Sequence, residues 1–280
     1  MSTPPLPSPL AAAVQRLERG FSGTVGVWVH DLSARETYGL RAGETFPPAS
    51  TIKLFILREL FRQVDTGAAR LDEERIMTAG DIVPGSGVLK DLTPGLRLSL
   101  RDAATLMVTV SDNTATNLVI GRLGTRTINR ATADAGFTGT RLGGKLFKGR
   151  GLRSSTTPRD LGTLMSEIAR GRAVSRSASA AMLDILRREQ YDTIVGRFLP
   201  QDQEELAQDR RTWKIASKSG SIKRHRHDVA FVEGQGLRYV VALMSRDCQD
   251  LSWGVENEAT VCLARIARAV HDHVASRRRD

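Results

Sequence analysis

The sequence lacks the features that several protein classes require. Only two cysteines, Cys248 and Cys262, occur in 280 residues, so we expect no disulfide framework, although a single bridge between them stays open. No apolar run approaches the length that crosses a bilayer, since even Phe55-Ile56-Leu57 is followed at once by Arg58-Glu59. We therefore expect neither a disulfide scaffold nor a membrane protein.

The first residues also lack a leader signal. The segment Met1-Ser2-Thr3-Pro4-Pro5 has neither a basic region nor a continuous apolar region. As written, the sequence predicts a cytoplasmic protein. It predicts a periplasmic or secreted one if a leader is missing from this sequence, and the two cysteines do not decide between these compartments.

Histidines are too few and too poorly placed for metal or triad chemistry. His225-Arg226-His227 contains its own opposing cation, and His271-Asp272-His273 falls in a basic C-terminal helix. A Ser-His-Asp triad is disfavoured because no nucleophile-elbow motif is present. We expect no metal and no cofactor.

The net charge of +10 indicates attraction to anionic partners. The basic residues are spread along the chain, with modest clusters at 223–227 and 277–279, and no zinc-finger spacing or aromatic RNA-binding signature accompanies them. We therefore expect an anionic partner other than nucleic acid, and we expect a monomer.

The order of elements predicts an α+β protein. Composition is typical of a globular chain, with 40% hydrophobic and 26% charged residues. Alternating apolar residues predict strands at 24–32, 36–40, 229–233 and 237–244, whereas helical periodicity dominates from about 50 to 190 and returns at 255–274. We therefore expect residues 1–45 and 196–280 to build a lobe containing an antiparallel sheet, and 46–195 to build an all-helical lobe, with the site in the cleft between them.

One polar step interrupts the start of an apolar helix. Pro47 and Pro48 cannot lie inside a helix, so the helix is predicted to begin at about Ser50. Residues three apart share a helix face, which brings the Lys53 side chain within reach of the Ser50 hydroxyl. This arrangement suits an activated serine nucleophile, but on its own it is more typical of a helix cap followed by a solvated lysine.

Two further motifs change that balance. Ser111-Asp112-Asn113 lies between two predicted helices, and Lys218-Ser219-Gly220-Ser221 precedes the C-terminal hairpin. Each is ordinary in isolation, as an interhelical turn and as a strand weakened by glycine. With Ser50-x-x-Lys53, in this order, they resemble the three motifs of class A β-lactamases and penicillin-binding proteins. The resemblance extends to Val88-Leu89, 114–117, 155–158 and 228–230, and implies the β-lactamase/D,D-peptidase-like fold.

The resemblance implies an acyl-serine mechanism. It makes Ser50 the nucleophile, Lys53 the group that accepts its proton, and Ser111 the relay to the departing lactam nitrogen. Burial of Lys53 beside Lys218 is expected to lower the pKa of its amine, as a base requires. The Ser221 N–H resembles an oxyanion-hole donor, together with the N–H of Ser50.

The resemblance also implies residues that bind the substrate. Asn113 resembles the residue that holds the substrate side chain. Lys218 and Ser219 resemble the anchor for the substrate carboxylate, beside the small Gly220. Arg226 resembles an arginine that several class A enzymes place on the neighbouring strand for the same carboxylate.

One departure from the family affects turnover. Class A enzymes carry a glutamate that activates the deacylating water, in the loop before the helix that starts at Thr157-Pro158. The corresponding loop, 137–153, has five Arg or Lys residues and no carboxylate. Loss of a general base typically costs about a hundredfold to ten-thousandfold, so slow deacylation is expected unless Asp72, Glu73, Glu74 or Asp81 replaces it.

The sequence thus predicts a serine hydrolase that forms an acyl-enzyme on Ser50 with β-lactams, or with a related amide or ester, and hydrolyses it slowly. A penicillin-binding, D,D-peptidase-like or esterase acyl acceptor is the nearest alternative. A non-catalytic basic binding protein is a third, disfavoured because it has no need of a nucleophile and its lysine.

Overall fold

The computed structural model describes residues 3–148, 153–208, 210 and 212–277, which group into two compact units. Unit 1 comprises the described residues of Met1–Thr51, Thr157–Ser166 and Asp192–Asp280, and unit 2 those of Ile52–Thr156 and Glu167–Tyr191. The sequence predicted boundaries after residues 45 and 195. In the structure, residues 46–51, 157–166 and 192–195 group with the sheet instead.

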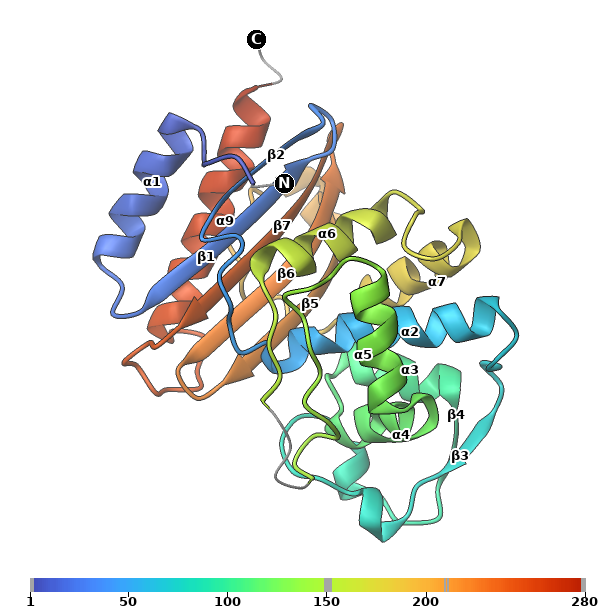
Figure 1. The fold of residues 1–280 in the computed structure, drawn as a ribbon. Helices are drawn as coiled ribbons and strands as arrows, with labels where there is room; N and C mark the ends of the chain where they lie inside the picture. The colour runs from blue at the N-terminus through green and yellow to red at the C-terminus, as the bar shows by residue number, and fades with distance from the viewer. Residues whose placement is uncertain (1–2, 149–152, 209, 211, 278–280) are drawn as a thin grey trace. The chain divides into compact units, whose positions relative to one another are not determined.

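Unit 1 is built on a five-stranded antiparallel sheet with the strand order β2-β1-β7-β6-β5 (Figure 1). Its strands are β1 (Thr24–Asp31), β2 (Glu36–Leu40), β5 (Lys214–Ile222), β6 (His225–Gly234) and β7 (Leu237–Arg246). The N-terminal helix α1 (Ser8–Arg19), the short α8 (Gln203–Ala207) and the C-terminal helix α9 (Glu258–Ser276) belong to the same unit. The predicted α+β class is therefore confirmed.

Alternation along β1 determines which face of the sheet each helix covers. Val25, Val27 and Val29 are buried in one apolar cluster that includes residues of α1 and α9, and both helices lie on the same side of the sheet in Figure 1. Trp28 points to the opposite face, where α6 (Pro158–Ala169) begins. A Cβ on Gly162 of α6 would lie 2.0 Å from the Trp28 ring, so glycine permits this close packing. This contact explains why 157–166 group with the sheet.

Unit 2 is mainly helical. Its helices are α2 (Lys53–Asp65), α3 (Leu100–Thr109), α4 (Asn113–Leu123), α5 (Thr125–Asp134) and α7 (Arg176–Leu186), with short 3-10 turns η2 (Ala79–Asp81) and η3 (Leu89–Asp91). The predicted cap of α3 is present, because Ser99 Oγ accepts from Asp102 N at 3.0 Å. The expectation of an all-helical part is wrong in one detail, since β3 (Glu74–Ile76) and β4 (Arg97–Ser99) pair as a small antiparallel sheet. Three-residue strands are too short for alternation to reveal.

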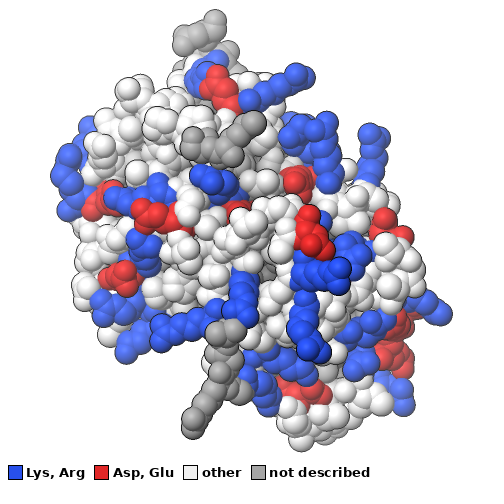
Figure 2. Space-filling view, in the orientation of Figure 1, with Lys and Arg blue, Asp and Glu red and all other residues white. Residues whose placement is uncertain are grey.

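Cys248 and Cys262 are buried free thiols, and burial raises the pKa of both, that of Cys262 to about 12. Lys and Arg are spread over the face shown in Figure 2, with Asp and Glu among them. In the described part of the chain, no helix is long and apolar enough to cross a membrane.

Candidate active site

Ser50 lies in a tight turn of unit 1. The 3-10 turn η1 (Ala49–Ile52) precedes α2, so the α-helix begins at Lys53 rather than at Ser50 as predicted. Pro48 O accepts from both Thr51 N (3.1 Å) and Thr51 Oγ1 (2.6 Å), and Ala49 has a left-handed φ of 48°. A non-glycine residue in that region is held there by its surroundings. The half-buried Ser50 is therefore carried on a constrained turn.

Gly220 brings strand β5 against this turn. A Cβ at Gly220 would lie 3.0 Å from the backbone nitrogens of Ser50 and Thr51 and 3.1 Å from Pro48 O. All three atoms belong to the backbone and cannot rotate away. The glycine of the Lys-Ser-Gly motif is thus required by the close approach of two backbones beside Ser50.

We expect Gly220→Ala to destabilise the protein by about 1–3 kcal/mol and to slow the predicted acylation of Ser50, because the turn that carries Ser50 must shift. Gly254→Ala is the matched control, since a Cβ there meets nothing within 4 Å. Thermal unfolding and the rate of covalent labelling by benzylpenicillin measure both effects. Equal behaviour of the two variants would contradict the packing argument.

The other residues of the motif occupy the edge strand of the sheet. Lys218 is fully buried, Ser219 is half-buried, and Ser221 is exposed near the end of β5. Among the described residues, β5 is an edge strand of the sheet and lies next to β6. Ser221 thus lies next to Gly220, on the strand that approaches the backbone of Ser50.

Arg226 has backbone partners of its own. Its Nη1 donates to Ile222 O and His225 O, both at 2.9 Å, and its Nη2 donates to Ser252 O at 2.6 Å. The guanidinium also lies 4.9 Å from the ring centroid of Trp253. These contacts indicate that Arg226 stabilises the β5–β6 turn. Its predicted role in binding a substrate carboxylate stays a prediction.

His227 is a buried neutral histidine on β6, paired in register with Gly220. Burial, with His225 and Arg226 nearby, lowers the pKa of His227 from 6.5 to about 3. Nδ1 accepts from Ser245 N at 3.3 Å. The neutral ring is the form that the folded unit accommodates.

Stability is therefore expected to fall in acid. The unfolded chain binds a proton at His227 below about pH 6.5 and the folded chain does not, so stability present above pH 6.5 is lost as the pH falls toward 3. The expected slope from this group is about 1.4 kcal/mol per pH unit. Urea unfolding of wild type and His227→Asn across this range measures it. Parallel pH profiles would show that His227 does not titrate on unfolding.

Unit 2 holds the lysine and the second motif in one buried cluster. Lys53 Nζ donates to Ser111 O (2.7 Å) and Asn113 Oδ1 (2.9 Å) and lies within hydrogen-bond distance of Ser111 Oγ (3.0 Å). Lys53 is 0% exposed and Ser111 4%. The structure thus brings three sequence-predicted site residues together, with the Lys53 amine on the Ser111 hydroxyl.

The segment around Ser111 is shaped by the preceding loop. Asp112 caps α4 by accepting from Ala115 N at 2.8 Å, and its other oxygen accepts from Val88 N and Leu89 N at 2.7 and 2.8 Å. Asn113 Nδ2 donates to the Pro84 carbonyl at 3.0 Å. Asp112 therefore joins the loop to the helix and leaves Ser111 and Asn113 for Lys53.

A further residue, Asn117, holds the loop that lacks an acid. Its amide donates to Leu146 O (2.9 Å) and accepts from Leu146 N (2.7 Å). Asn117 lies one helical turn after Asn113 on α4, so the Leu146 backbone is fixed next to the Lys53 cluster within unit 2. In the sequence, Asn117 stood out only as a residue flanking the Ser-Asp-Asn motif. Residues 149–152 of this loop lie outside the described residues.

None of the four acids proposed to replace the absent loop glutamate is well suited to act as a general base. Asp72, Glu73 and Glu74 form ion pairs with Arg70, Arg122 and Arg97, respectively. Asp81 lies beside the loop, 4.0 Å from Lys145. Burial raises its pKa, but hydrogen bonds from Thr78 and the charges of Lys145 and Lys148 outweigh this, so the pKa of Asp81 is below its usual value. A carboxylate with a lowered pKa is a weak base.

Known proteins resemble this chain over most of its length. The model of the Beta-lactamase enzyme family matches residues 9–274 of the chain. The chain belongs to this family. It is 25% identical over 267 residues to a β-lactamase of Rhodobacter capsulatus, which covers 93% of this chain and 88% of that protein.

Solved structures agree with this membership. The β-lactamase of Sphaerobacter thermophilus DSM 20745 superposes with a TM-score of 0.85 at 30% identity, covering 96% of this chain and 97% of that one. PBP-A superposes with a TM-score of 0.85 at 29% identity, covering 99% and 100%, as a leucine-to-glutamate mutant in an acyl-enzyme complex with penicillin G. The predicted resemblance is confirmed, and the chain is a class A β-lactamase-like serine hydrolase.

Proposed function

We propose that this member of the β-lactamase family forms an acyl-enzyme with β-lactams through Ser50 and hydrolyses it slowly. The observation that carries the proposal is the buried contact of Lys53 Nζ with Ser111 Oγ and Asn113 Oδ1. A buried ammonium or amine that faces a serine hydroxyl is suited to proton transfer. The names of the relatives, β-lactamases and PBP-A, support β-lactams as the substrate class.

In the proposed acylation, Ser50 Oγ attacks the lactam carbonyl carbon while its proton passes to the neutral amine of Lys53. The N–H groups of Ser50 and Ser221 stabilise the oxyanion. The lactam C–N bond then breaks, and the nitrogen takes a proton from Ser111 Oγ, which Lys53 replenishes. One ester bond forms and one amide bond breaks. In total, one proton leaves Ser50 and one proton is added to the departing nitrogen, by way of Lys53 and Ser111.

The substrate is held by groups from two motifs. In this proposal the Asn113 amide binds the acylamino side chain of the β-lactam, and Lys218 and Ser219 bind its carboxylate, with Arg226 as a further cation. The positive charge of Lys218 suits an anionic ligand. This assignment makes the carboxylate, rather than the lactam ring alone, a requirement for rapid acylation.

Deacylation is the slow step of the proposal. The described residues of the 137–153 loop include no carboxylate, and Asn117 holds Leu146 there by its backbone. The apolar Leu146 side chain cannot take a proton from water. The acyl-enzyme is therefore expected to accumulate.

The deciding experiment follows a chromogenic cephalosporin and benzylpenicillin with purified protein, recording hydrolysis and intact mass together. The proposal predicts a burst near one equivalent, a lasting mass increase, and the loss of both in Ser50→Ala. Ser22→Ala, outside the motifs, is the control. Absence of labelling would refute acylation, and rapid multiple turnover would refute the slow-deacylation part.

The likeness to PBP-A favours a second candidate, a penicillin-binding or D,D-peptidase-like acyl acceptor whose own substrate is a peptide or ester. A peptide ending in D-Ala-D-Ala and a thioester analogue distinguish this candidate. Their turnover, at a rate above that of the cephalosporin and dependent on Ser50, would favour it over a β-lactam hydrolase.

A further inference from the structure

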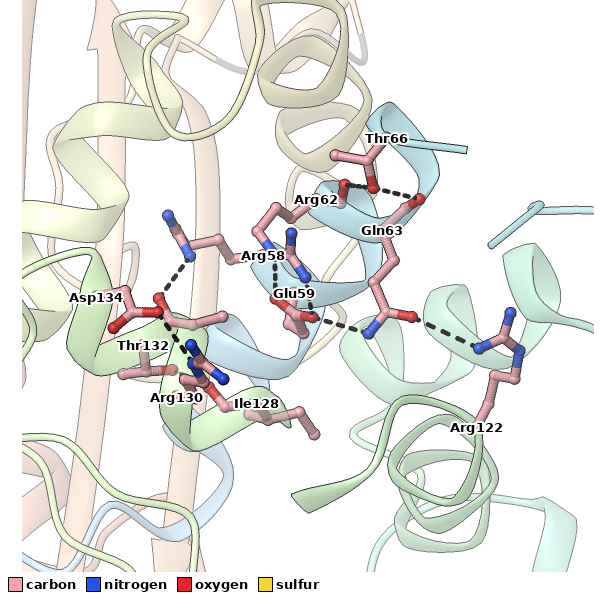
Figure 3. A network of polar contacts seen from close by, with 11 residues as sticks. Arg58, Glu59, Arg62, Gln63, Thr66, Arg122, Ile128, Arg130, Thr132 and Asp134 are labelled. Atoms are coloured by element: carbon pink, nitrogen blue, oxygen red, sulfur yellow. Dashed lines mark hydrogen bonds and ion pairs between the residues drawn. The ribbon is translucent and has the colours of Figure 1, made fainter. Parts of the chain in front are cut away.

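A cavity of about 520 Å³ lies on unit 2, away from the motif residues, between helices α2 and α5. The helices supply Arg58 and Arg62 from α2, and Thr127, Arg130, Ala131 and Asp134 from α5. Its volume falls in the range of pockets for small molecules. Three of its side chains are arginines, and all three, Arg58, Arg62 and Arg130, are labelled in Figure 3.

Arg58 carries hydrogen-bonding capacity that the described protein leaves unused. Its Nη1 donates to Ala131 O at 3.3 Å, but the buried Nε has no partner among the described residues. The guanidinium lies 5.8 Å from the ring centroid of Phe137. Arginine stays protonated even when burial lowers its pKa, as it does here. A buried N–H without a partner costs about 1–3 kcal/mol.

The other two arginines differ in how firmly they are paired. Arg62 is held by both carboxylate oxygens of the buried Glu59, at 2.7 and 2.9 Å, and Gln63 shares that carboxylate (Figure 3). Arg130 is 84% exposed, and its Nε lies 3.7 Å from Asp134 Oδ2. Such a long, exposed pair is weak and can rearrange. The cavity therefore offers Arg58 from α2 and Arg130 from α5, whereas the charge of Arg62 is already paired with Glu59.

We propose that this cavity binds a small organic anion, whose carboxylate or phosphate group accepts hydrogen bonds from Arg58 and Arg130. A guanidinium matches a carboxylate or phosphate in a two-bond geometry. The methyl groups of Ala131 and Ala135 provide an apolar surface for the rest of the ligand. Arg58 follows Lys53 by five residues on α2, roughly 7.5 Å along the helix axis, so the site is separate from the Lys53 cluster.

Calorimetric titration with inorganic phosphate and with succinate tests the proposal and separates the two head groups. Saturable binding of at least one probe is expected, weakened about tenfold in Arg58→Gln and in Arg130→Gln. Arg101→Gln, which removes one exposed arginine of unit 2 outside the cavity, should bind as wild type does. This control shows whether weaker binding results merely from removing one positive charge from a chain with a net charge of +10.

A second variant, which is expected to strengthen binding, distinguishes a lost ligand contact from structural damage caused by replacing Arg58. Asp134→Asn removes the carboxylate that lines the cavity and should strengthen binding, whereas Asp184→Asn, in a similar i,i+4 pair with Arg188, should not. If Arg58→Gln fails to fold, Arg130→Gln and Asp134→Asn decide the matter. Absence of saturable binding by both probes, or equal weakening in Arg101→Gln, would overturn the proposal.

Discussion

Replacing Lys53 with methionine is expected to slow acylation by β-lactams about a hundredfold to ten-thousandfold. The variant keeps much of the side-chain volume in a site that is 0% exposed, but removes the group that contacts Ser111 O, Ser111 Oγ and Asn113 Oδ1. The proposed mechanism loses its general base, for which that range is typical. The rate of mass increase with benzylpenicillin, measured under pseudo-first-order conditions, gives the effect directly.

The structural cost of this substitution must be separated from the chemical one. Ser111 and Asn113 lose a buried donor in Lys53→Met, which is expected to lower the free energy of unfolding by about 1–3 kcal/mol. Lys214→Met, at an exposed position of β5, controls for the loss of one positive charge. A folded Lys53→Met protein that is acylated at the wild-type rate would exclude Lys53 as the base.

Replacing Leu146 with glutamate is expected to accelerate deacylation about a hundredfold to ten-thousandfold, the usual contribution of a general base. Asn117 holds the backbone of residue 146 through two hydrogen bonds, which do not depend on the side chain at that position. Leu146 is only half-buried, so a carboxylate there does not enter a closed core. The substitution therefore adds an acid to the loop with its backbone anchor unchanged.

Acyl-enzyme decay by intact mass and steady-state hydrolysis of the cephalosporin should rise together in Leu146→Glu. Leu146→Gln has nearly the same shape and no basic carboxylate, and it should leave deacylation slow. Equal decay in both variants would show that the missing acid is not what limits turnover. Since Lys145 and Lys148 flank the position, the pKa of the new carboxylate is expected to be low, which places the gain toward the lower end of the range.

The two substitutions test opposite halves of one reaction. Lys53→Met acts on formation of the acyl-enzyme and Leu146→Glu on its breakdown, so a double variant should be acylated slowly and deacylated quickly. In that variant the burst disappears because the acyl-enzyme no longer accumulates. Loss of the burst with unchanged acylation would instead point to an effect of Leu146→Glu alone.

Local patterns in the sequence were sufficient to predict most elements. Alternation predicts β1, β2, β6 and β7, because an antiparallel strand with distinct faces imposes a period of two. Cap residues predict the starts of α3 and α6, where Ser99 and Thr157 accept from the amides three residues on. The order of Ser-x-x-Lys, Ser-Asp-Asn and Lys-Ser-Gly indicates the family, since three spaced motifs rarely coincide by chance.

Local sequence patterns could not predict contacts between distant segments of the chain. The start of α2 at Lys53 depends on the turn at Ala49 and on the approach of Gly220, which is far along the chain. The bracing role of Arg226 depends on the carbonyl of Ser252, and the fixed position of Leu146 depends on Asn117. The sequence by itself determined the family, the α+β class and the candidate site residues, because these follow from short-range periodicity and from residue identity. Only the tertiary structure decided that Lys53 lies on Ser111, that Asn117 anchors the acid-free loop and that Arg58 faces a cavity, because each depends on which side chain a distant backbone segment places beside it.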